Sequence, residues 1–289
     1  MKPIPSIIQY LIAVVALISA SLGLWSNLPN WSESREILAG PTSTIDYFTS
    51  LNLEAKAAFV YEPDTGRVLY AKEAGERLPI ASVTKLMTAL AASELLPDST
   101  IIPLARRRYH LKDLVALTLI SSSNQGAMAL ATATTEALGR DLVAEMNAEA
   151  NILGLKQTTF SNPTGLDLAD GQAGSYSSAY DIAHLFTHIL AAHPELLAAT
   201  KFEEIEASTV EGVRHRYQNT NEIISELSGL LGSKTGFTDV AEGSLVIAFD
   251  RGLNQPVVVV VLGSSAQGRF RDVKQLVEAT IRTFIPVTI

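Results

Sequence analysis

Three short groups of hydroxyl, amide and amine side chains have the chemistry needed for acyl transfer. They are Ser82 and Lys85 within "ASVTKLM", then Ser122 and Asn124, then Lys234-Thr235-Gly236. A serine hydroxyl becomes a nucleophile when a neighbouring base takes its proton, and a neutral lysine amine can be that base. Because a Ser-x-x-Lys spacing arises by chance roughly once in a chain of this size, the weight lies in the three groups together and in their order.

The first group lies at the start of an apolar run with helical spacing, which predicts a helix from Ala81 to Leu96. Ser82 and Lys85 would then share one face of that helix. Burial and a second cation would lower the pKa of Lys85, and Lys234 could supply that cation. Taken alone, the pair is explained more simply by a helix N-cap and a solvated lysine.

The other two groups suit the binding of a peptide. Ser122 and Asn124 follow the apolar run 114–120 and precede another helical run, so they could relay a proton and hold a substrate amide. Lys234-Thr235-Gly236 lies on a strand-like segment, where a peptide could lie along the edge and have its carboxylate neutralised. A helix cap and a surface strand ending in a turn are the simpler alternatives.

The surrounding elements predict an α+β fold in which helices cover one antiparallel sheet. Apolar runs at 57–61 and 68–71 flank a Pro-Asp-Thr-Gly turn and predict a hairpin. Helical patterns cover 110–160 in two or three pieces and return at 179–192 and 270–284. Between the last two helical patterns, strand-like segments lie at 230–237, 243–249 and 256–265, with links short enough for antiparallel pairing.

The first 25 residues predict an export signal or a membrane anchor. Ile7 to Trp25 carries no charged residue and follows Lys2, and this length favours an uncleaved anchor over a cleaved signal. Residues 26–50 are polar and turn-rich, as expected of a linker, which leaves 51–289 for the catalytic domain. We therefore expect the domain outside the cytoplasm, in the periplasm or on the outer face of the cytoplasmic membrane.

Composition excludes several classes of function. The net charge of −8 argues against nucleic-acid binding, which requires a basic face. The absence of cysteine excludes disulfides, thiol nucleophiles and Cys-ligated metals. His184 and His188 are four residues apart, with His193 close behind, but Leu185 stands where a His-Glu-x-x-His zinc motif needs glutamate. We expect no metal, no cofactor, and a solvated loop at Arg106-Arg107-Arg108.

Longer stretches around the three groups resemble a known family. They are "LPIASVTKLMTALAA", "SSSNQGAMALA", "MNAEANILGLKQTTFSNPTGLD" and "GLLGSKTGFTDVAEGSLVIAF". The sequence is similar over roughly residues 55–285 to the serine D-alanyl-D-alanine carboxypeptidases of the low-molecular-mass penicillin-binding proteins. The resemblance implies a β-lactamase/transpeptidase-like fold with a five-stranded antiparallel sheet.

The resemblance also implies a role for each residue of the three groups. Ser82 would attack the carbonyl between two terminal D-alanines, with Lys85 as general base and Ser122 passing a proton to the leaving D-alanine. The backbone N–H groups of Ser82 and Phe237 would form the oxyanion hole.

The remaining residues of the groups would bind substrate. Asn124 would hold the substrate backbone, Lys234 would supply positive potential, Thr235 would hold the terminal carboxylate, and Gly236 would keep the strand edge open. The implied partners are peptidoglycan stem peptides, with β-lactams as inhibitors and the membrane contacted through the N-terminal segment.

Alternatives within the same fold remain. A class A β-lactamase would need a glutamate before the third group, but the stretch 162–167 reads Asn-Pro-Thr-Gly-Leu-Asp. A D,D-endopeptidase of peptidoglycan cross-links would use the same residues with a more open cleft. A slow-turnover sensor of β-lactams or muropeptides is supported by the interval from Lys85 to Ser122, which is shorter than is usual in the family.

Overall fold

A five-stranded antiparallel sheet lies at the centre of the structure, a computed structural model that describes residues 46–284. Its strands, in spatial order, are β10 (Leu230–Thr238), β11 (Glu242–Asp250), β12 (Pro256–Ser264), β1 (Ala57–Glu62) and β2 (Arg67–Lys72). The sequence predicted all five, together with the turn between β1 and β2. The first and last strands meet because β1 pairs with β12 in antiparallel register.

Apolar side chains of the central strands point alternately to the two faces of the sheet, and a hydrophobic core lies on each face. Ala57 and Phe59 of β1 pack into the core beneath the main group of helices, whereas Ala58 and Val60 pack on the opposite face. Side chains alternate in this way because successive residues of a strand point to opposite faces. Both faces are buried, and this explains why β12 reads as an uninterrupted run of valine.

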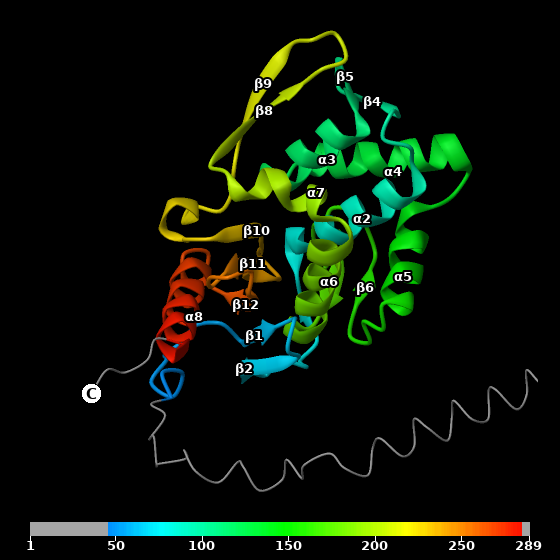
Figure 1. The fold of residues 1–289 in the computed structure, drawn as a ribbon. Helices are drawn as coiled ribbons and strands as arrows, with labels where there is room; N and C mark the ends of the chain where they lie inside the picture. The colour runs from blue at the N-terminus through cyan, green and yellow to red at the C-terminus, as the bar shows by residue number, and fades with distance from the viewer. Residues whose placement is uncertain (1–45, 285–289) are drawn as a thin grey trace, which may run out of the picture. The chain divides into compact units, whose positions relative to one another are not determined.

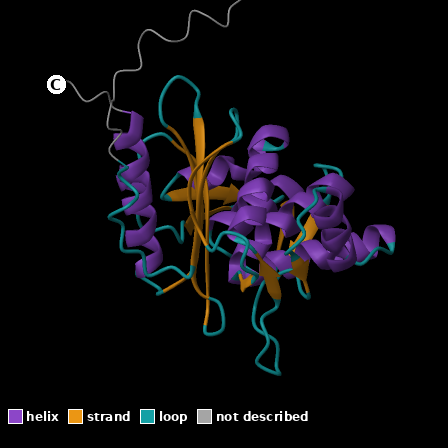
Figure 2. Ribbon diagram, turned by 90° about the horizontal axis from the view of Figure 1, so that it is seen from below, coloured by secondary structure: helices purple, strands orange, loops and turns teal. Residues whose placement is uncertain are grey.

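One helix covers one face of the sheet and a block of helices covers the other (Figures 1 and 2). The single helix is α8 (Gly268–Phe284), which packs on β11 and β12. The block contains α2 (Lys85–Leu95), α3 (Leu111–Ile120), α4 (Asn124–Leu138), α5 (Leu142–Ile152), α6 (Ala179–Ala192) and α7 (Pro194–Leu197). Single-turn helices lie at η1 (Ala81–Thr84), η2 (Ala198–Lys201) and η3 (Ile224–Glu226). The mixed architecture agrees with the predicted α+β class.

Several short strands were not predicted. They are β3 (Leu78–Pro79), β4 (Ile101–Leu104), β5 (Arg107–His110), β6 (Thr159–Phe160), β7 (Ser175–Ser177), β8 (Glu204–Ser208) and β9 (Arg214–Gln218). The hydroxyls of Tyr109 and Tyr217 share a 2.7 Å hydrogen bond between the β4–β5 and β8–β9 hairpins. The expected loop at 106–108 is wrong in part, because Arg107 and Arg108 lie in β5.

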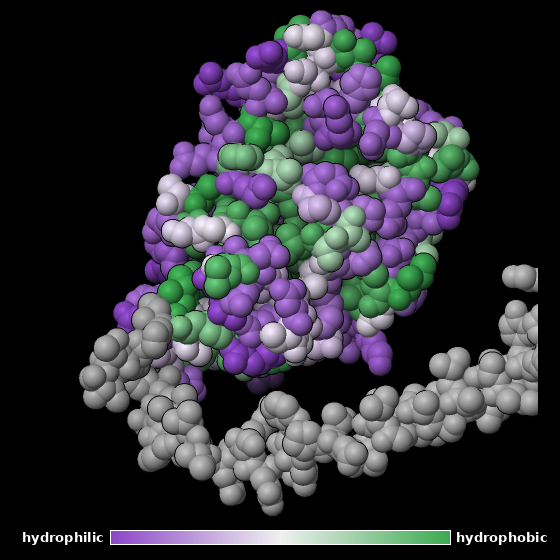
Figure 3. Space-filling model, in the orientation of Figure 1, coloured by the Kyte–Doolittle hydropathy of each residue, from purple (hydrophilic) through white to green (hydrophobic). Residues whose placement is uncertain are grey.

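The folded unit begins before the predicted domain boundary. The expected anchor, and the expected linker as far as residue 45, lie outside the described residues. Phe48 falls within that expected linker, yet it is buried and its ring stacks on Tyr70 at 5.4 Å. Within residues 46–284, no helix combines the length and the apolar composition that crossing a bilayer requires. On the face shown in Figure 3, hydrophilic side chains cover most of the surface and apolar ones form smaller patches.

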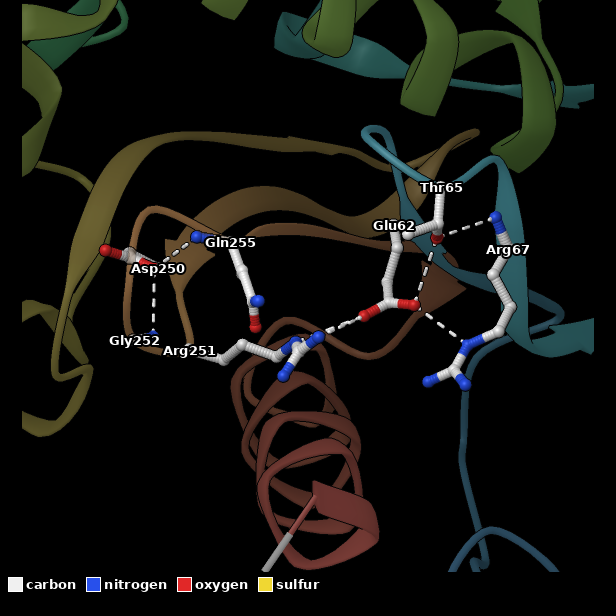
Figure 4. Close-up of polar contacts among 7 residues, drawn as sticks. All are labelled: Glu62, Thr65, Arg67, Asp250, Arg251, Gly252 and Gln255. Carbon is white, nitrogen blue, oxygen red and sulfur yellow. Dashed lines mark hydrogen bonds and ion pairs between the residues drawn. The ribbon is translucent and has the colours of Figure 1, made fainter.

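A buried carboxylate on β1, that of Glu62, is paired with two arginines near the end of α8 (Figure 4). Glu62 is only 4% exposed, and its two oxygens lie 2.8 Å from Nε of Arg67 and 3.0 Å from Nη2 of Arg251. The two guanidinium groups in turn lie over the ring of Phe284, at 4.9 and 3.7 Å from its centroid. The charge of Glu62 is therefore satisfied although its side chain is removed from water.

We predict that Glu62→Ala lowers the free energy of unfolding by about 2–3 kcal/mol, because two charged hydrogen bonds are lost and Arg251 is left largely buried without a partner. Chemical denaturation would measure the change. The matched control is Glu278→Ala, which removes an exposed ion pair with Arg282 on α8 and is expected to cost about 0.5 kcal/mol or less. Equal losses in the two variants would contradict the assignment.

Candidate active site

Ser82 and Lys85 form a hydrogen-bonded pair at the start of α2. Ser82 lies in the single turn η1, and Lys85 is the first residue of the helix that follows. Nζ of Lys85 lies 2.7 Å from Oγ of Ser82 and 2.7 Å from the carbonyl oxygen of Thr164. The simpler alternative is wrong, because Thr84 is the N-cap residue of α2 and the side chain of Lys85 is fully buried.

Burial lowers the pKa of Lys85 to about 7. Removing an ammonium group from water disfavours its charged form, so a substantial fraction of this amine is neutral near neutral pH. A neutral amine in hydrogen-bond contact with a hydroxyl can accept its proton. The geometry and the pKa together suit Lys85 as a general base for Ser82.

Lys234 is a second buried amine, and it contacts Ser122. Its Nζ lies 2.9 Å from Oγ of Ser122 and donates to the carbonyl oxygen of Thr235 at 2.8 Å. Burial, the charge of Lys85 and the charge of Arg269 all lower the pKa of Lys234 well below its usual value. The influence thus runs from Lys85 to Lys234, whereas the sequence predicted that Lys234 would lower the pKa of Lys85, which burial lowers instead.

Ser122 has the backbone conformation of a strained residue. Its φ is 54°, in the left-handed region that side chains other than glycine rarely adopt. This residue lies between α3 and α4, where the chain reverses after the buried end of α3. Strain at such a position persists only when the surrounding structure imposes it, and here it coincides with the hydroxyl that contacts Lys234.

Asn124, the first residue of α4, borders a cavity of about 590 Å³. Asn162 and Thr164 line the same cavity, and apolar parts of its wall come from Leu104 and Met128. Since Thr164 also accepts a hydrogen bond from Lys85, the cavity lies beside the serine–lysine pair. It offers room for a peptide segment, with Asn124 available to bind its backbone amides.

Gly236 allows strand β10 to approach Ser82 closely. A Cβ atom at Gly236 would lie 2.7 Å from the carbonyl oxygen of Ile80 and 3.2 Å from the backbone nitrogen of Ser82. The next residue, Phe237, is half-exposed beside this contact. The structure therefore brings Gly236 and Phe237 of β10 to the backbone of the serine, as the expected oxyanion hole requires.

Two site residues were not identified from the sequence. The hydroxyls of Thr220 and Thr235 share a hydrogen bond of 2.5 Å, and Nη1 of Arg269 donates to the carbonyl oxygen of Gly236 at 2.6 Å. Thr220 follows β9, whereas Arg269 lies in the first turn of α8. Nothing in their spacing relates either residue to β10.

The loop that holds Lys85 is fixed by its own hydrogen bonds. Oδ1 of Asn162 accepts from the backbone N–H groups of Thr164 and Gly165, at 3.0 and 2.7 Å. Gly165 has a φ of +75°, and a Cβ atom there would lie 1.9 Å from the carbonyl oxygen of Ala81. A glycine is therefore needed for the loop to place the carbonyl of Thr164 against the amine of Lys85.

Comparison with known proteins points to one family. The family model described as D-alanyl-D-alanine carboxypeptidase matches residues 44–101 and 91–266. The D-alanyl-D-alanine carboxypeptidase DacF of Bacillus subtilis is 34% identical over 235 residues, a match that covers 73% of this chain and 58% of DacF. A D-alanyl-D-alanine endopeptidase of Pseudomonas aeruginosa is 31% identical over 234 residues, with 73% of this chain and 71% of the relative covered. The matched part thus spans less than two thirds of DacF.

Solved structures agree with the fold. Penicillin-binding protein D2 from Listeria monocytogenes, in an ampicillin-bound form, has a TM-score of 0.70 and 32% sequence identity. The alignment covers 79% of this chain and 98% of that protein. The Streptomyces K15 DD-transpeptidase, at 23% identity and a TM-score of 0.72, shares the fold.

We predict that the rate constant for acylation of Ser82 by a fluorescent penicillin rises with pH and levels off above about pH 7. Below its pKa, Lys85 is charged and cannot accept the proton, so the rate should fall about tenfold per pH unit. Stopped-flow or gel-based labelling across this range would measure it. Lys274→Gln, on the surface of α8, is the control and should leave the profile unchanged. A rate constant that does not vary between about pH 5 and pH 8 would contradict the role of Lys85.

We predict that Gly236→Ala slows acylation by roughly 10²-fold, as for the loss of one oxyanion-hole donor. The added Cβ would push β10 away from Ser82, with little effect on the rest of the sheet. The control is Gly75→Ala, where a Cβ meets nothing within 4 Å and φ is not positive. Labelling at the unaltered rate in Gly236→Ala would show that the close approach of β10 is unimportant.

Proposed function

This chain belongs to the D-alanyl-D-alanine carboxypeptidase family, and we propose that it removes the terminal D-alanine from peptidoglycan stem peptides through an acyl-enzyme on Ser82. The observation that carries the proposal is the 2.7 Å contact between Nζ of Lys85 and Oγ of Ser82, with a lysine pKa of about 7. Together they give a nucleophile beside a base that is neutral when needed.

Acylation begins at the carbonyl between the two D-alanines. Oγ of Ser82 attacks this carbon while Nζ of Lys85 takes the hydroxyl proton. The backbone N–H groups of Ser82 and Phe237 stabilise the negative charge that develops on the carbonyl oxygen. The closeness of Gly236 to the nitrogen of Ser82 supports this pairing of donors.

Collapse of the tetrahedral intermediate requires a proton on the leaving amine. Ser122, whose hydroxyl contacts Lys234 at 2.9 Å, is placed to pass a proton to the nitrogen of the departing D-alanine. That proton is the one that Lys85 took from Ser82, so its transfer leaves Lys85 neutral again before water attacks. The C–N bond then breaks and D-alanine leaves, with the rest of the stem peptide held as an ester on Ser82. Water attacks this ester, Lys85 accepts the water proton, and Ser82 regains its hydrogen.

The substrate carboxylate has a matching binding site. Lys234 supplies a cation, and the paired hydroxyls of Thr220 and Thr235 supply a donor on the same strand edge. Without substrate the pKa of Lys234 is lowered by burial and by neighbouring cations. A bound carboxylate favours the charged form of Lys234, so binding of the anion and protonation of this amine support each other.

A second candidate is hydrolysis of peptidoglycan cross-links by the same residues. The 31% identity to the D-alanyl-D-alanine endopeptidase of Pseudomonas aeruginosa favours it. The chemistry at Ser82 would be identical, and the outcome depends on whether the cleft admits a second peptide strand beyond the leaving group. In either case the substrate lies outside the cytoplasmic membrane, and we propose the same location for the enzyme, attached through its N-terminal segment.

We predict that Ser82→Ala abolishes both labelling by fluorescent penicillin and release of D-alanine from a stem pentapeptide. The control is Ser93→Ala, a serine on α2 outside the site, which should retain both activities. Mass spectrometry of purified muropeptides would show loss of the terminal residue by the unaltered protein.

Each other outcome has a distinct meaning. Labelling of Ser82→Ala would show that the nucleophile is another residue. Labelling of the unaltered protein without any D-alanine release or cross-link cleavage would replace the proposal with a slow-turnover sensor. Cleavage of cross-linked dimers without release of terminal D-alanine would replace it with the endopeptidase.

A further inference from the structure

Two histidines and a glutamate meet where α2 and α6 end. Glu94 is the second-last residue of α2, His188 lies in the last turns of α6, and His193 is the C-cap residue of α6. Each offers one atom suited to binding a metal, and the three atoms all lie within 4.8 Å of one another. The group lies at the opposite end of α2 from Lys85.

The spacing of two of these atoms suits metal ligands better than a direct bond. Nε2 of His193 lies 3.5 Å from Oε1 of Glu94, which is longer than an ordinary hydrogen bond of about 2.7–3.2 Å. Ligands bound to zinc at about 2.0–2.2 Å with tetrahedral angles are separated by roughly 3.4 Å. The separation of Glu94 and His193 is thus close to one edge of a zinc tetrahedron.

His188 supplies an independent observation. Its Nε2 atom is buried, yet it has no hydrogen-bond partner among the described residues. Buried side-chain nitrogens are normally paired. An ion-pair network of Glu94 with a protonated His193 would explain those two residues but would leave this nitrogen unsatisfied. A bound cation would satisfy all three side chains.

The electrostatic surroundings also favour a cation. Both α2 and α6 end here, and the C-terminal ends of helices carry partial negative charge. Glu195 brings a further carboxylate near the group, with its Oε1 3.5 Å from Nδ1 of His193, and a neighbouring carboxylate can orient a metal-bound imidazole.

We propose that Glu94, His188 and His193 bind a zinc ion that links α2 to α6, with water as the fourth ligand. Two imidazoles and a carboxylate are borderline to hard ligands, a set that zinc commonly takes. The sequence analysis had considered His184 and His188, with His193 close behind, and had predicted no metal. In the structure, the ring of His184 instead stacks on that of Tyr61 at 5.2 Å and lies tilted against that of Tyr180 at 4.0 Å.

A zinc ion at this position would stabilise α2, the helix that begins with Lys85. Lys85 begins α2, and the proposed ion fixes the other end of that helix to α6. Zinc bound to the folded chain and not to the unfolded chain stabilises the fold in proportion to the logarithm of its free concentration. The role is structural, and acyl transfer at Ser82 needs no metal.

The test uses the full-length chain, purified in detergent without a histidine tag and stripped of metal with a chelator. Zinc is then titrated in competition with a chromophoric chelator, and thermal unfolding is followed with and without zinc. We expect one zinc ion per chain and a higher unfolding temperature with zinc. Cobalt(II) in place of zinc should give the visible absorption of a tetrahedral site.

Three variants and a matched control make the test specific. Glu94→Gln, His188→Ala and His193→Gln should each lose stoichiometric zinc and the zinc-dependent rise in unfolding temperature. His184→Ala, one turn earlier on α6, should keep both. Since His188 is partly buried, circular dichroism is used to check that its variant folds. His193→Gln gives an independent measurement of the loss of zinc binding.

Substitution of Glu195 tests whether the neighbouring carboxylate supports the binding of zinc. Glu195→Gln should weaken zinc binding by about tenfold without abolishing it. The proposal is overturned if the unaltered chain binds no zinc in competition with the chelator. It is also overturned if Glu94→Gln and His193→Gln bind zinc as tightly as His184→Ala, because the ligands would then lie elsewhere.

Discussion

The burial of two lysine amines beside each other is the constraint on which the site depends. An ammonium group removed from water is unfavourable unless it is neutralised or fully hydrogen-bonded. Lys85 and Lys234 are both almost completely buried, and each is surrounded by oxygen acceptors. Those acceptors come from four segments: the turn η1 that carries Ser82, the loop at 162–167, the junction of α3 with α4, and strand β10. Much of the local fold can be understood as the supply of these oxygens.

Close backbone approach is what allows so many segments to meet at one point. Gly165 lets the 162–167 loop reach the backbone of Ala81, and Gly236 lets β10 reach that of Ser82. Arg269 then connects the far layer to the site, because it reaches from α8 to the carbonyl of Gly236. The two helical layers on opposite faces of the sheet therefore both contribute to the position of β10 beside the nucleophile.

The sequence could predict the parts of the fold that rest on local patterns. The five central strands could be predicted because they are largely apolar and bounded by turns. Ser82, Lys85 and Lys234 could be identified because their motifs occur together and in a specific order. The hairpin strand β9 was not predicted, because the stretch Arg214–Gln218 is mostly polar and its residues are exposed or only partly buried. Thr220 and Arg269 were missed because only the tertiary structure brings them to the site. Thr164 was missed because it contacts Lys85 through its backbone carbonyl, a group that every residue has and that no sequence motif identifies.

The two amines also explain how a site with excess positive charge can still contain a base. Burial lowers the pKa of both lysines, and the charge of Lys85 lowers that of Lys234 further, so without substrate the site avoids holding two full charges. In the proposed reaction the substrate carboxylate lies beside Lys234 and favours its protonation. Burial lowers the pKa of Lys85 to about 7, so this amine can be neutral while Lys234 is charged. The carboxylate that identifies the correct substrate would therefore assign the proton to Lys234 and leave Lys85 free to act on Ser82.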